Sequence, residues 1–553
     1  MTITQHTYRA FLVQAGGDVE LRVKGGRIVL SDDWAPHVQA ELRIAPPASA
    51  TRALLDPRLN PRIRVTADAV TGAGPQSRTF NLGLRVQSAS LVDADLPLQL
   101  ASDEALLGDW APLADDTTPL SYQGSIRALV NYVLGKVIPG AALQPGVDAP
   151  IKALAPAVNL VPNPRAGLGL TDWSASSGSV FRQSSGGPAG APTYVSVQSS
   201  GGGIIVDYAR TNLNFQPNTT YRLSAYMSGP VPATLDALIY DGAGTVLLDV
   251  QEPPAQLMSQ WTQRSVTFTT PPGAARAQLR FFTTQAVPSL QYFNVTGVRL
   301  TELPVDPTDT SYFDGDTIDT AEYVYTWQAG GHSSPSLRTV ATAAPDPDAL
   351  VWDAGQNALT YLLTLLQPKG LRLVCDEARL WTLRDALYSA PGSLSVRRGV
   401  NLIDGDDEVS RDAGQWYDAA VIRYRWTDGD GQAQERVDAY AAATPYTRAT
   451  VLDVDSAYPG PGLAQYMVKR AKGRGHDVTV RLVADWRVRA EQVVTARLEL
   501  DGPVLTGRAS RVDFDLDTDE LTVTTRAVET VAGAIDLLPG VINSLPGVIN
   551  SLT

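Results

Sequence analysis

Short runs of alternating apolar and polar residues fill the middle of the chain, from about residue 159 to residue 338. Residues 221–226 form one such run after the turn-forming sequence of residues 216–220, and residues 264–269 form another. The sequence Pro-Pro-Gly ends the second run, and a third run follows at residues 277–282. Alternation with a period of two, broken by Pro, Gly and Asn about every ten residues, predicts the strands of an antiparallel β-sandwich.

Both ends of the chain alternate in the same way. Near the N-terminus, residues 21–23 and 28–30 flank Gly25 and Gly26, which predicts a hairpin because glycine accepts positive φ angles. Further alternating runs cover residues 63–67, 80–87, 421–426, 478–486, 494–500 and 512–523. An alternating strand buries one face only, so we expect a small barrel or a sheet packed on one side at each end.

Two helices are predicted between these β regions. In residues 125–137, apolar side chains recur at i, i+3, i+4, i+7, i+8 and i+11, and Pro139-Gly140 ends the pattern. A second stripe of leucines runs from Leu359 to Leu366. The predicted sandwich therefore interrupts a helical region. Such an insertion is tolerated where the ends of the inserted segment lie close together on a surface.

The central segment also resembles a known class of domain. The resemblance is carried by the Asn-Pro opening of residues 159–164, by TYRLSAYM (220–227), by WTQRSVTFTTPPGAARAQLRFF (261–282) and by FNVTGVRLTE (293–302). Together these segments resemble the jelly-roll carbohydrate-binding modules of glycan-active proteins. The resemblance covers about a quarter of the chain and implies a jelly-roll sandwich with a glycan as its ligand.

Other segments resemble phage proteins. DTSYFDGDT (309–317), with YTW (325–327) and GHSSPS (331–336), looks like a segment that recurs in minor tail proteins of phages infecting actinobacteria. GVNLIDGDDEVSRDAGQWYDAAVIRYRW (399–426) and GRASRVDFDLDTDELTVTTR (507–526) resemble the tail hub proteins of long-tailed phages. In that family two similar barrels per subunit form a pseudo-sixfold ring when three subunits assemble. The resemblance therefore implies a homotrimer at the tail tip.

The resulting fold class is mainly β with a few helices, in which two barrel-like hub β domains flank a helical region and an inserted jelly-roll β-sandwich. The predicted parts are a barrel-like hub domain at 1–110, a helical connector at 111–156, the sandwich with a wrapping C-terminal segment at 157–340, a helix–hairpin hub domain at 341–393, a second barrel-like hub domain at 394–530 and a tail at 531–553. The tail contains the sequence LPGVINS twice in succession. It either stays disordered or docks on a neighbouring chain.

Length and charge narrow the classes of function. A chain of 553 residues is too long for one hydrophobic core, so several domains are expected. The formal net charge of −13 argues against nucleic acid as a partner, because phosphates require a basic surface. No apolar run reaches the ~20 residues needed to span a bilayer. The first residues lack the basic and apolar regions of a signal peptide, so we expect synthesis in the host cytoplasm without export.

The residue types that carry catalysis elsewhere form no recognisable site in this sequence. The G-x-S-x-G, Walker A and H-E-x-x-H motifs are absent, and the four histidines are scattered. The lone Cys375 lies in an apolar run, which predicts a buried, inert thiol. Two groups of neighbouring carboxylates indicate loop turns or cation binding rather than glycoside hydrolysis, which needs two acids facing each other across a cleft. The groups are Asp314 with Asp316, and Asp404 with Asp406 and Asp407.

We therefore predict no enzymatic activity, no catalytic residue and no cofactor. Calcium is common in jelly-roll carbohydrate modules, so the resemblance leaves room for a structural calcium ion in the sandwich. The sequence assigns no ligands to it.

Alternation along the predicted strands also predicts a ligand face. If Leu223 and Ala225 point into the sandwich core, their neighbours point outward, and the same reasoning applies to residues 235–241 and 277–282. The outward residues that suit a sugar are Arg222, Tyr226, Tyr240, Arg280 and Phe282. Aromatic rings stack on the C–H faces of sugars, and guanidinium groups bind hydroxyl or acidic groups. The alternative is that linkers or a partner sheet cover this face and that its aromatic residues are merely packed.

The sequence thus predicts a structural virion protein that forms the hub of a phage tail tip, closes the tail tube and presents a glycan-binding module to the host surface. The expected partners are further copies of this chain in a homotrimer, the distal tail protein, the tape measure protein, other minor tail proteins and a host-surface glycan. Contacts between copies are expected through residues 1–110 and 394–530. The alternatives are a glycan-degrading tail enzyme and a bacterial cell-wall-binding protein. The missing acid/base pair counts against the first, and the missing signal peptide against the second.

Overall fold

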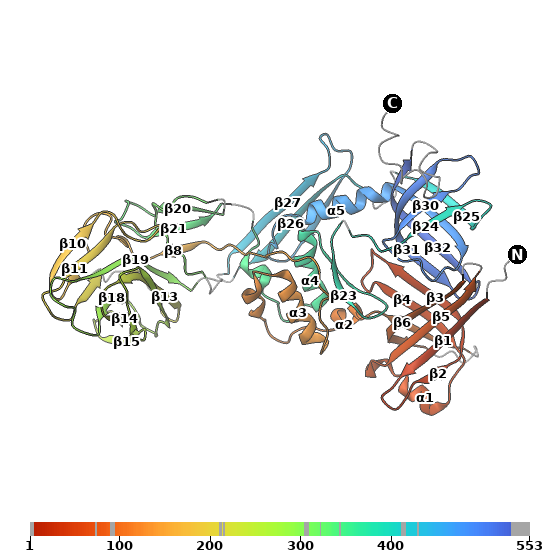
Figure 1. Ribbon diagram of the computed structural model, residues 1–553, viewed down its shortest axis with the longest axis horizontal. Coiled ribbons are helices and arrows are strands. Elements are labelled where there is room, and N and C mark those ends of the chain that lie inside the picture. The colour runs from red at the N-terminus through yellow and green to blue at the C-terminus, as the bar shows by residue number, and fades with distance from the viewer. Residues whose placement is uncertain are drawn as a thin grey trace. The chain divides into compact units, whose positions relative to one another are not determined.

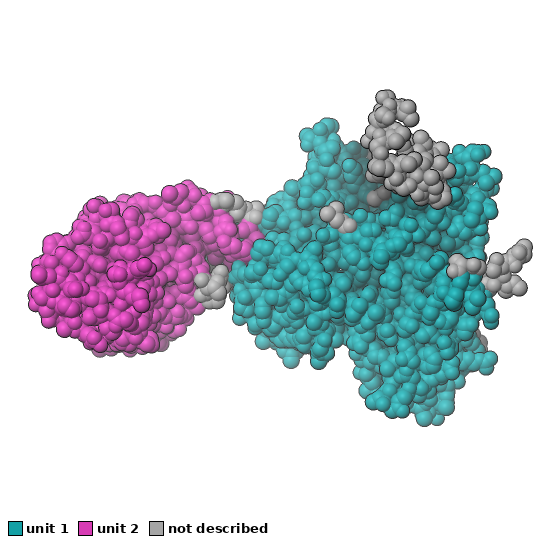
Figure 2. Space-filling view, viewed as in Figure 1, with its two compact units in different colours: residues 1–151, 351–553 teal, residues 152–350 magenta. Residues whose placement is uncertain are grey.

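The computed structural model describes residues 5–71, 74–88, 95–208, 213, 216–303, 309–320, 322–341, 344–386, 388–410, 416–428 and 431–531. The chain forms two compact units, which are residues 1–151 with 351–553 (unit 1) and residues 152–350 (unit 2) (Figure 2). Strand accounts for 45% of the structure and helix for 12%, so the predicted mainly β class with few helices is confirmed. No helix in the described part of the chain is long and apolar enough to cross a membrane.

Most strands of unit 1 belong to a single 13-stranded sheet (Figure 1). They are β1 (Gln5–Val13), β2 (Val19–Leu21), β3 (Val23–Ser31), β4 (Val38–Ile44), β5 (Arg62–Thr71), β6 (Gly74–Gln87), β7 (Leu96–Ala101), β24 (Ser393–Arg397), β25 (Leu402–Val409), β29 (His476–Val483), β30 (Val493–Arg497), β31 (Val504–Asp515) and β32 (Glu520–Val531). The order is β2-β1-β5-β6-β7-β4-β3-β31-β32-β29-β25, and β30 pairs with both β31 and β24.

Strands β3 and β31 join the N-terminal and C-terminal halves of this sheet. They pair antiparallel from Arg27 opposite Asp515 to Ser31 opposite Arg511. Ile28 and Phe514 face each other in this pairing, and both are fully buried in a core that contains residues from both halves. The expected barrel-like domains are therefore observed as two halves of one sheet. The described strands close no barrel, because β3 and β31 hydrogen-bond to each other instead of closing each flank on itself.

Two of the helices of unit 1, α3 and α4, begin at a residue whose side chain caps them. The helices of the unit are α1 (Ser49–Leu54), α2 (Glu104–Asp109), α3 (Ile126–Val137), α4 (Ala358–Leu366) and α5 (Leu463–Lys472), with the 3-10 turns η1 (Pro57–Leu59), η2 (Thr118–Tyr122), η4 (Gln367–Lys369) and η5 (Gly473–Gly475). The Ser125 side chain accepts a hydrogen bond from the Ala128 N–H at the start of α3. Asn357 caps α4 in the same way. Both helices expected from the apolar stripes are thus present.

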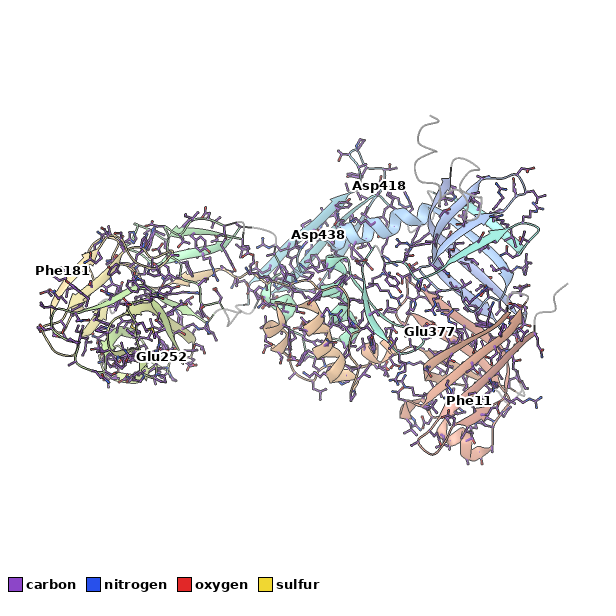
Figure 3. All side chains as sticks on the ribbon, in the orientation of Figure 1. Phe11, Phe181, Glu252, Glu377, Asp418 and Asp438 are labelled. Atoms are coloured by element: carbon purple, nitrogen blue, oxygen red, sulfur yellow. The ribbon has the colours of Figure 1, made fainter. Side chains whose placement is uncertain are left out.

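Two smaller sheets complete unit 1. They are the hairpin of β22 (Arg372–Cys375) with β23 (Trp381–Arg384), and the sheet of β27 (Ala433–Ala441), β26 (Ala419–Thr427) and β28 (Ala449–Val454). Asp438 of β27, labelled in Figure 3, accepts hydrogen bonds from the N–H groups of Gly462 and Ala464 and so holds the start of α5. Cys375 is fully buried as predicted, and burial raises the pKa of its thiol.

Unit 2 is inserted between two backbone positions of unit 1 that are both tied to its helical region. The Ile151 N–H donates to the Gln123 carbonyl at 2.9 Å. Asp116 and Trp352 exchange two backbone hydrogen bonds of 2.9 Å. The chain therefore leaves and re-enters unit 1 at anchored positions, as an inserted segment requires.

Unit 2 contains two packed sheets and a smaller third one. The five-stranded sheet runs β10 (Ser179–Gln183), β11 (Tyr194–Gln198), β19 (Tyr292–Glu302), β13 (Thr220–Ser228) and β17 (Thr262–Thr269); the six-stranded sheet runs β15 (Val246–Gln251), β14 (Pro232–Tyr240), β18 (Arg276–Thr283), β12 (Ile205–Tyr208) and β9 (Trp173–Ala175), with β16 (Ala255–Gln256) beside β14; the third runs β20 (Tyr323–Trp327), β21 (Ser336–Val340) and β8 (Ala157–Asn159). A 3-10 turn, η3 (Pro347–Leu350), ends the unit. Leu223 and Phe293 from the first sheet share a core with Leu235 and Phe281 from the second.

The segment after the sandwich, residues 309–340, folds back over the outer face of the five-stranded sheet; we call it the wrap segment. Arg299 of β19 points outward from the sandwich, yet its side chain is only 2% exposed, because it donates to the Ser311 carbonyl and packs on the Phe313 ring. Gly297 forms a bulge in β19 at φ +61°, and a Cβ there would lie 2.8 Å from the Tyr226 ring. Only glycine meets both demands at this position.

Unit 2 has its own core and its own edge strands, so we predict that a fragment of residues 152–350 folds alone. The expected result is a cooperative thermal transition with near-ultraviolet circular dichroism from its buried aromatic residues, of which Trp173 and Phe281 pack together at 6.2 Å between ring centroids. A fragment that stays unfolded while the full chain folds would contradict the prediction. The matched control joins residues 151 and 351 by a short Gly-Ser linker, which is expected to leave unit 1 folded.

Candidate functional site

The five predicted sugar-binding residues lie on two different sheets. Arg222 and Tyr226 belong to β13 of the five-stranded sheet. Tyr240 lies on β14, and Arg280 and Phe282 lie on β18, all in the six-stranded sheet. Since both sets point away from the shared core, they face opposite sides of the sandwich. The structure therefore brings three of the five together and separates the other two from them.

The outer face of the six-stranded sheet carries a row of polar and aromatic side chains; we call it the open face. In the antiparallel register, Tyr240 lies opposite Arg276, Asp236 opposite Arg280, and Thr234 opposite Phe282. On the other side of β18, Asp207 of β12 lies opposite Arg280. Tyr240 and Phe282 mark the two ends of this row and are separated by six residue positions along β18, which corresponds to roughly 20 Å at about 3.3 Å per residue.

Arg280 at the middle of the open face is held by a carboxylate. Its Nε donates to Asp236 Oδ1 at 2.9 Å, and its Nη2 pairs with the other oxygen. The Asp236 side chain is 1% exposed and that of Arg280 27%. Burial raises the pKa of Asp236 and outweighs the lowering effect of the Arg280 hydrogen bonds and charge. The guanidinium also lies 5.9 Å from the centre of the Phe282 ring. Asp236 therefore fixes the orientation of a cation that stays partly accessible.

A chain of hydrogen bonds fixes the neighbouring side chains. The Tyr240 hydroxyl donates to Gln278 Oε1 at 3.0 Å, and Gln278 Nε2 donates to Asp207 Oδ1 at 3.1 Å. These three groups keep further donor and acceptor positions that a sugar hydroxyl can use. Asp207, Asp236 and Gln278 were not among the predicted site residues. The signal was present for Asp236 and Gln278, which occupy outward positions in the same runs as Tyr240 and Arg280. Asp207 lies on β12, outside those runs.

The opposite face, with Arg222 and Tyr226, is covered by the wrap segment. Arg222 Nη1 donates to the Asp309 carbonyl at 3.3 Å, and Gln263 Nε2 donates to the Thr310 carbonyl at 2.5 Å. Tyr226 lines a cavity of ≈560 Å³ together with Tyr323 and other residues of the wrap segment. On this side of the sandwich the structure matches the alternative given above, in which a linker covers the outward residues.

Asp309 is the centre of the polar contacts that hold the wrap segment. Its Oδ2 accepts from Arg338 at 2.7 Å and lies 3.5 Å from Arg299 Nη2. The Phe313 ring lies between these two guanidinium groups, at 5.1 and 5.2 Å. Burial tends to raise the pKa of Asp309, but Arg299, Ser311 and Arg338 lower it to about 2. Burial lowers the pKa of Arg299 to about 10, which leaves it charged at neutral pH.

The carboxylates of the DTSYFDGDT segment take part in a similar structural network. Arg165 Nε lies 2.6 Å from Asp314 Oδ2, and its Nη2 lies 2.5 Å from Asp316 Oδ2. Trp327 Nε1 donates to Asp316 Oδ1 at 2.9 Å, and His332 Nε2 lies 2.8 Å from Asp316 Oδ2. These contacts engage both carboxylates in tying the wrap segment to the start of the sandwich.

The second acidic group lies in a strand, since Asp404, Asp406 and Asp407 belong to β25 rather than to a loop. Across the described residues, no three His, Cys, Asp or Glu side chains come together in a way that could hold a metal ion.

Comparison with known proteins gives one family match. Residues 161–289 match the family model described as a carbohydrate binding domain. None of the curated proteins matches the chain significantly.

Several solved structures are similar to this chain. The tail protein from Neisseria meningitidis MC58 is 9% identical over 94% of this chain and 96% of its own, with a TM-score of 0.39. The 43 kDa tail protein of prophage MuSo2 from Shewanella oneidensis is 9% identical over 95% and 98%, with a TM-score of 0.36. The enzymatically active domain of tailspike protein 4 from bacteriophage CBA120 is 15% identical over 26% of this chain, with a TM-score of 0.23. The match spans only 21% of that tailspike domain. At these TM-scores none of the three likenesses bears on function.

The substitution Asp309→Asn tests the network of the wrap segment. It leaves Arg299 and Arg338 without their carboxylate, and breaking a buried ion pair in this way costs about 3–5 kcal/mol. We expect a loss of that order in the free energy of unfolding of unit 2, measured by urea titration of the full chain. The control is Asp319→Asn, at an exposed residue. The Asp319 carboxylate accepts a hydrogen bond from the Tyr325 N–H, and the amide oxygen of asparagine can do the same. Equal stability of the two variants would contradict the prediction.

The same carboxylate predicts an acid-dependent loss of stability. The folded pKa of Asp309, about 2, lies below the ordinary value of 3.8, so its contribution is complete above about pH 4 and is lost as the pH falls toward 2. We expect unit 2 to unfold at lower urea concentration at pH 2.5 than at pH 5. In Asp309→Asn, the free energy of unfolding should change less between pH 5 and pH 2.5 than in the wild type. If the variant loses as much stability as the wild type between pH 5 and pH 2.5, other groups cause the acid sensitivity.

Proposed function

We propose that this chain is a structural protein of a phage tail. In this proposal it forms the hub of the tail tip as a homotrimer, closes the tail tube, and presents unit 2 as a glycan-binding module for attachment to the host cell. The proposed partners are the distal tail protein, the tape measure protein and other minor tail proteins, as the resemblance of residues 399–426 and 507–526 implies. Contacts between copies are proposed through residues 1–110 and 394–530.

The observation that carries glycan binding is the open face within a segment that matches a carbohydrate binding domain. Tyr240 and Phe282 offer aromatic surface at its two ends, and Arg280, Gln278 and Asp207 offer charged and polar groups between them. Because Tyr240 and Phe282 occupy strand positions roughly 20 Å apart, their rings are not placed to contact the same sugar ring. The face therefore suits an oligosaccharide chain laid across the strands' outer surface rather than a single sugar.

The structural role is supported by the way in which unit 2 is inserted. The two β-rich flanks of the sequence form one sheet around one core. Unit 2 is a separate compact body that leaves this sheet intact. An assembly unit with a separately folded binding module is the organisation that a tail-tip protein with an adhesive function requires.

The alternative of a glycan-degrading enzyme is not supported by the acids described above, which take part in structural contacts. Asp314 and Asp316 are held by Arg165, Trp327 and His332, and Asp236 is paired with Arg280. The alternative of a bacterial cell-wall-binding protein shares the same open face, so only the location of the protein separates it from a tail protein. Labelling of purified phage particles with an antibody against unit 2 would make that distinction.

The test of the open face uses Tyr240→Ala and Phe282→Ala in the full chain. Each ring removed from a sugar contact should weaken binding about tenfold, and the double variant about a hundredfold, because sites this far apart act additively. The measurement is affinity electrophoresis in gels that contain soluble cell-wall polysaccharides from actinobacteria. Phe181→Ala, at an aromatic residue that is 42% exposed on β10, is the matched control and should bind like the wild type.

A third arm, Tyr226→Ala, distinguishes the two sides of the sandwich. Loss of binding in this variant, with binding retained in Tyr240→Ala and Phe282→Ala, would place the glycan in the cavity beneath the wrap segment and overturn the open face. Retained binding in all variants, with native circular dichroism, would exclude both sides.

A further inference from the structure

A cavity of ≈720 Å³ in unit 1 is unusually rich in cations for so acidic a chain. It is lined by residues of η4, α5, β31 and β32 and by the loops around them. Its charged lining residues are six cations, Lys369, Arg372, Lys469, Arg470, Arg508 and Arg526, and three carboxylates, Asp32, Asp385 and Glu491. The chain as a whole has a net charge of −13. The lining of the cavity therefore carries more positive than negative groups, although the chain as a whole is negatively charged.

Three of the six cations already have a carboxylate partner. Arg372 pairs with Glu491, which also accepts from Arg384 at 2.5 Å. Arg470 and Arg526 both pair with Asp32 and with its neighbour Asp33. These arginines belong to β22, α5 and β32 and tie these elements to the rest of unit 1 through their ion pairs.

The other three cations, Lys369, Lys469 and Arg508, have no carboxylate within salt-bridge distance among the described residues. Arg508 donates to the Ala386 carbonyl at 3.1 Å, a neutral acceptor. Lys369 and Lys469 are exposed and Arg508 is half-buried, and partial desolvation lowers the pKa of Lys369. Like charges that line one cavity repel one another, and an anionic ligand would relieve that repulsion. The three come from three elements, η4, α5 and β31, and line one cavity.

The same chain exposes a matching set of carboxylates. Strand β25 lies at the edge of the 13-stranded sheet, and seven of its eight residues are exposed. Asp404, Asp406 and Glu408 occupy alternate positions and so point to one side, about 7 Å apart. Asp407, on the other side of the strand, is engaged by His476 at 2.7 Å. Asp404 Oδ2 lies 3.7 Å from Arg481 Nη2 in an exposed pair. Within the described part of the chain, none of these acids is paired with a cation of the cavity.

We propose that the cavity binds the acidic edge strand β25 of a second copy of this chain. Lys369, Lys469 and Arg508 of one copy would face Asp404, Asp406 and Glu408 of the next. The two surfaces differ, so the contact is head-to-tail and closes a ring when the rotation between copies permits. The inference rests on the proposed self-assembly and extends the proposed contact ranges, since Lys369 lies outside residues 1–110 and 394–530.

Charge reversal in the full chain tests this contact. In Lys369→Glu/Lys469→Glu, like charges meet at the contact, so the molar mass measured by light scattering after size exclusion should fall to that of one chain. Asp404→Lys/Asp406→Lys/Glu408→Lys changes only exposed residues and should cause the same loss. The combined variant, with all five reversals, restores opposite charges and should recover the wild-type mass. Raising the salt to 1 M should weaken the wild-type assembly, because the screening length then falls to about 3 Å.

Arg22→Glu/Arg52→Glu is the matched control, since both arginines are exposed and lie outside the cavity. It should keep the wild-type mass. Three results would overturn the contact: a wild-type chain that is monomeric at all concentrations, an unchanged mass in the cavity variant, or a combined variant that fails to reassociate. Glycan binding by unit 2, measured on the same variants, should be unaffected throughout. Its loss in wild type would count against the proposed function and leave the contact between copies standing.

Discussion

The pairing of β3 with β31 is the constraint on which the rest of unit 1 depends. It joins Arg27 to Asp515 across nearly the whole sequence and places strands from both ends of the chain over one core. The helical region, the hairpin of β22 and β23, and the small sheet beside α5 are all attached to this frame. Because strands from the N-terminal and C-terminal halves pair with each other, the segment between them can accept an insertion without breaking this sheet. The anchored backbone at Asp116, Gln123, Ile151 and Trp352 is where that insertion occurs.

Each unit is stabilised internally by buried pairs of arginine and carboxylate. In unit 2, Asp309 gathers Arg299 and Arg338 beneath the wrap segment. In unit 1, Glu491 gathers Arg372 and Arg384. Arginine suits this role because its planar guanidinium binds carboxylates through several hydrogen bonds and stays charged when buried. The network around Asp314 and Asp316 shows why the DTSYFDGDT segment is rich in acids: both carboxylates are held by side chains that fasten the wrap segment.

The topology of unit 2 decides which predicted ligand residues can act together. Alternation identified the outward residues of β13, β14 and β18, but it gives no information on which strands share a sheet. The observed order puts β14 next to β18 and places β13 in the opposing sheet. One outer face then keeps Tyr240, Arg280 and Phe282 partly exposed, and the wrap segment covers the other. The cations of the unit 1 cavity are a further case, because Lys369, Lys469 and Arg508 lie far apart in sequence and share no local pattern.

The sequence by itself determined the local features of this protein. The apolar stripe of residues 125–137 and its Ser125 cap define α3, and the period-two runs define the strands, because both patterns depend on neighbours within one turn or one pleat. The outward direction of Tyr240, Arg280 and Phe282 follows from the same alternation. The tertiary structure alone decided the partners of those strands. It merged two expected barrel-like flanks into one sheet through β3 and β31, divided the predicted ligand residues between two faces, and brought the cations of the unit 1 cavity together. Strand pairing between distant segments is set by the packing of the whole core, and no pattern within a single segment records it.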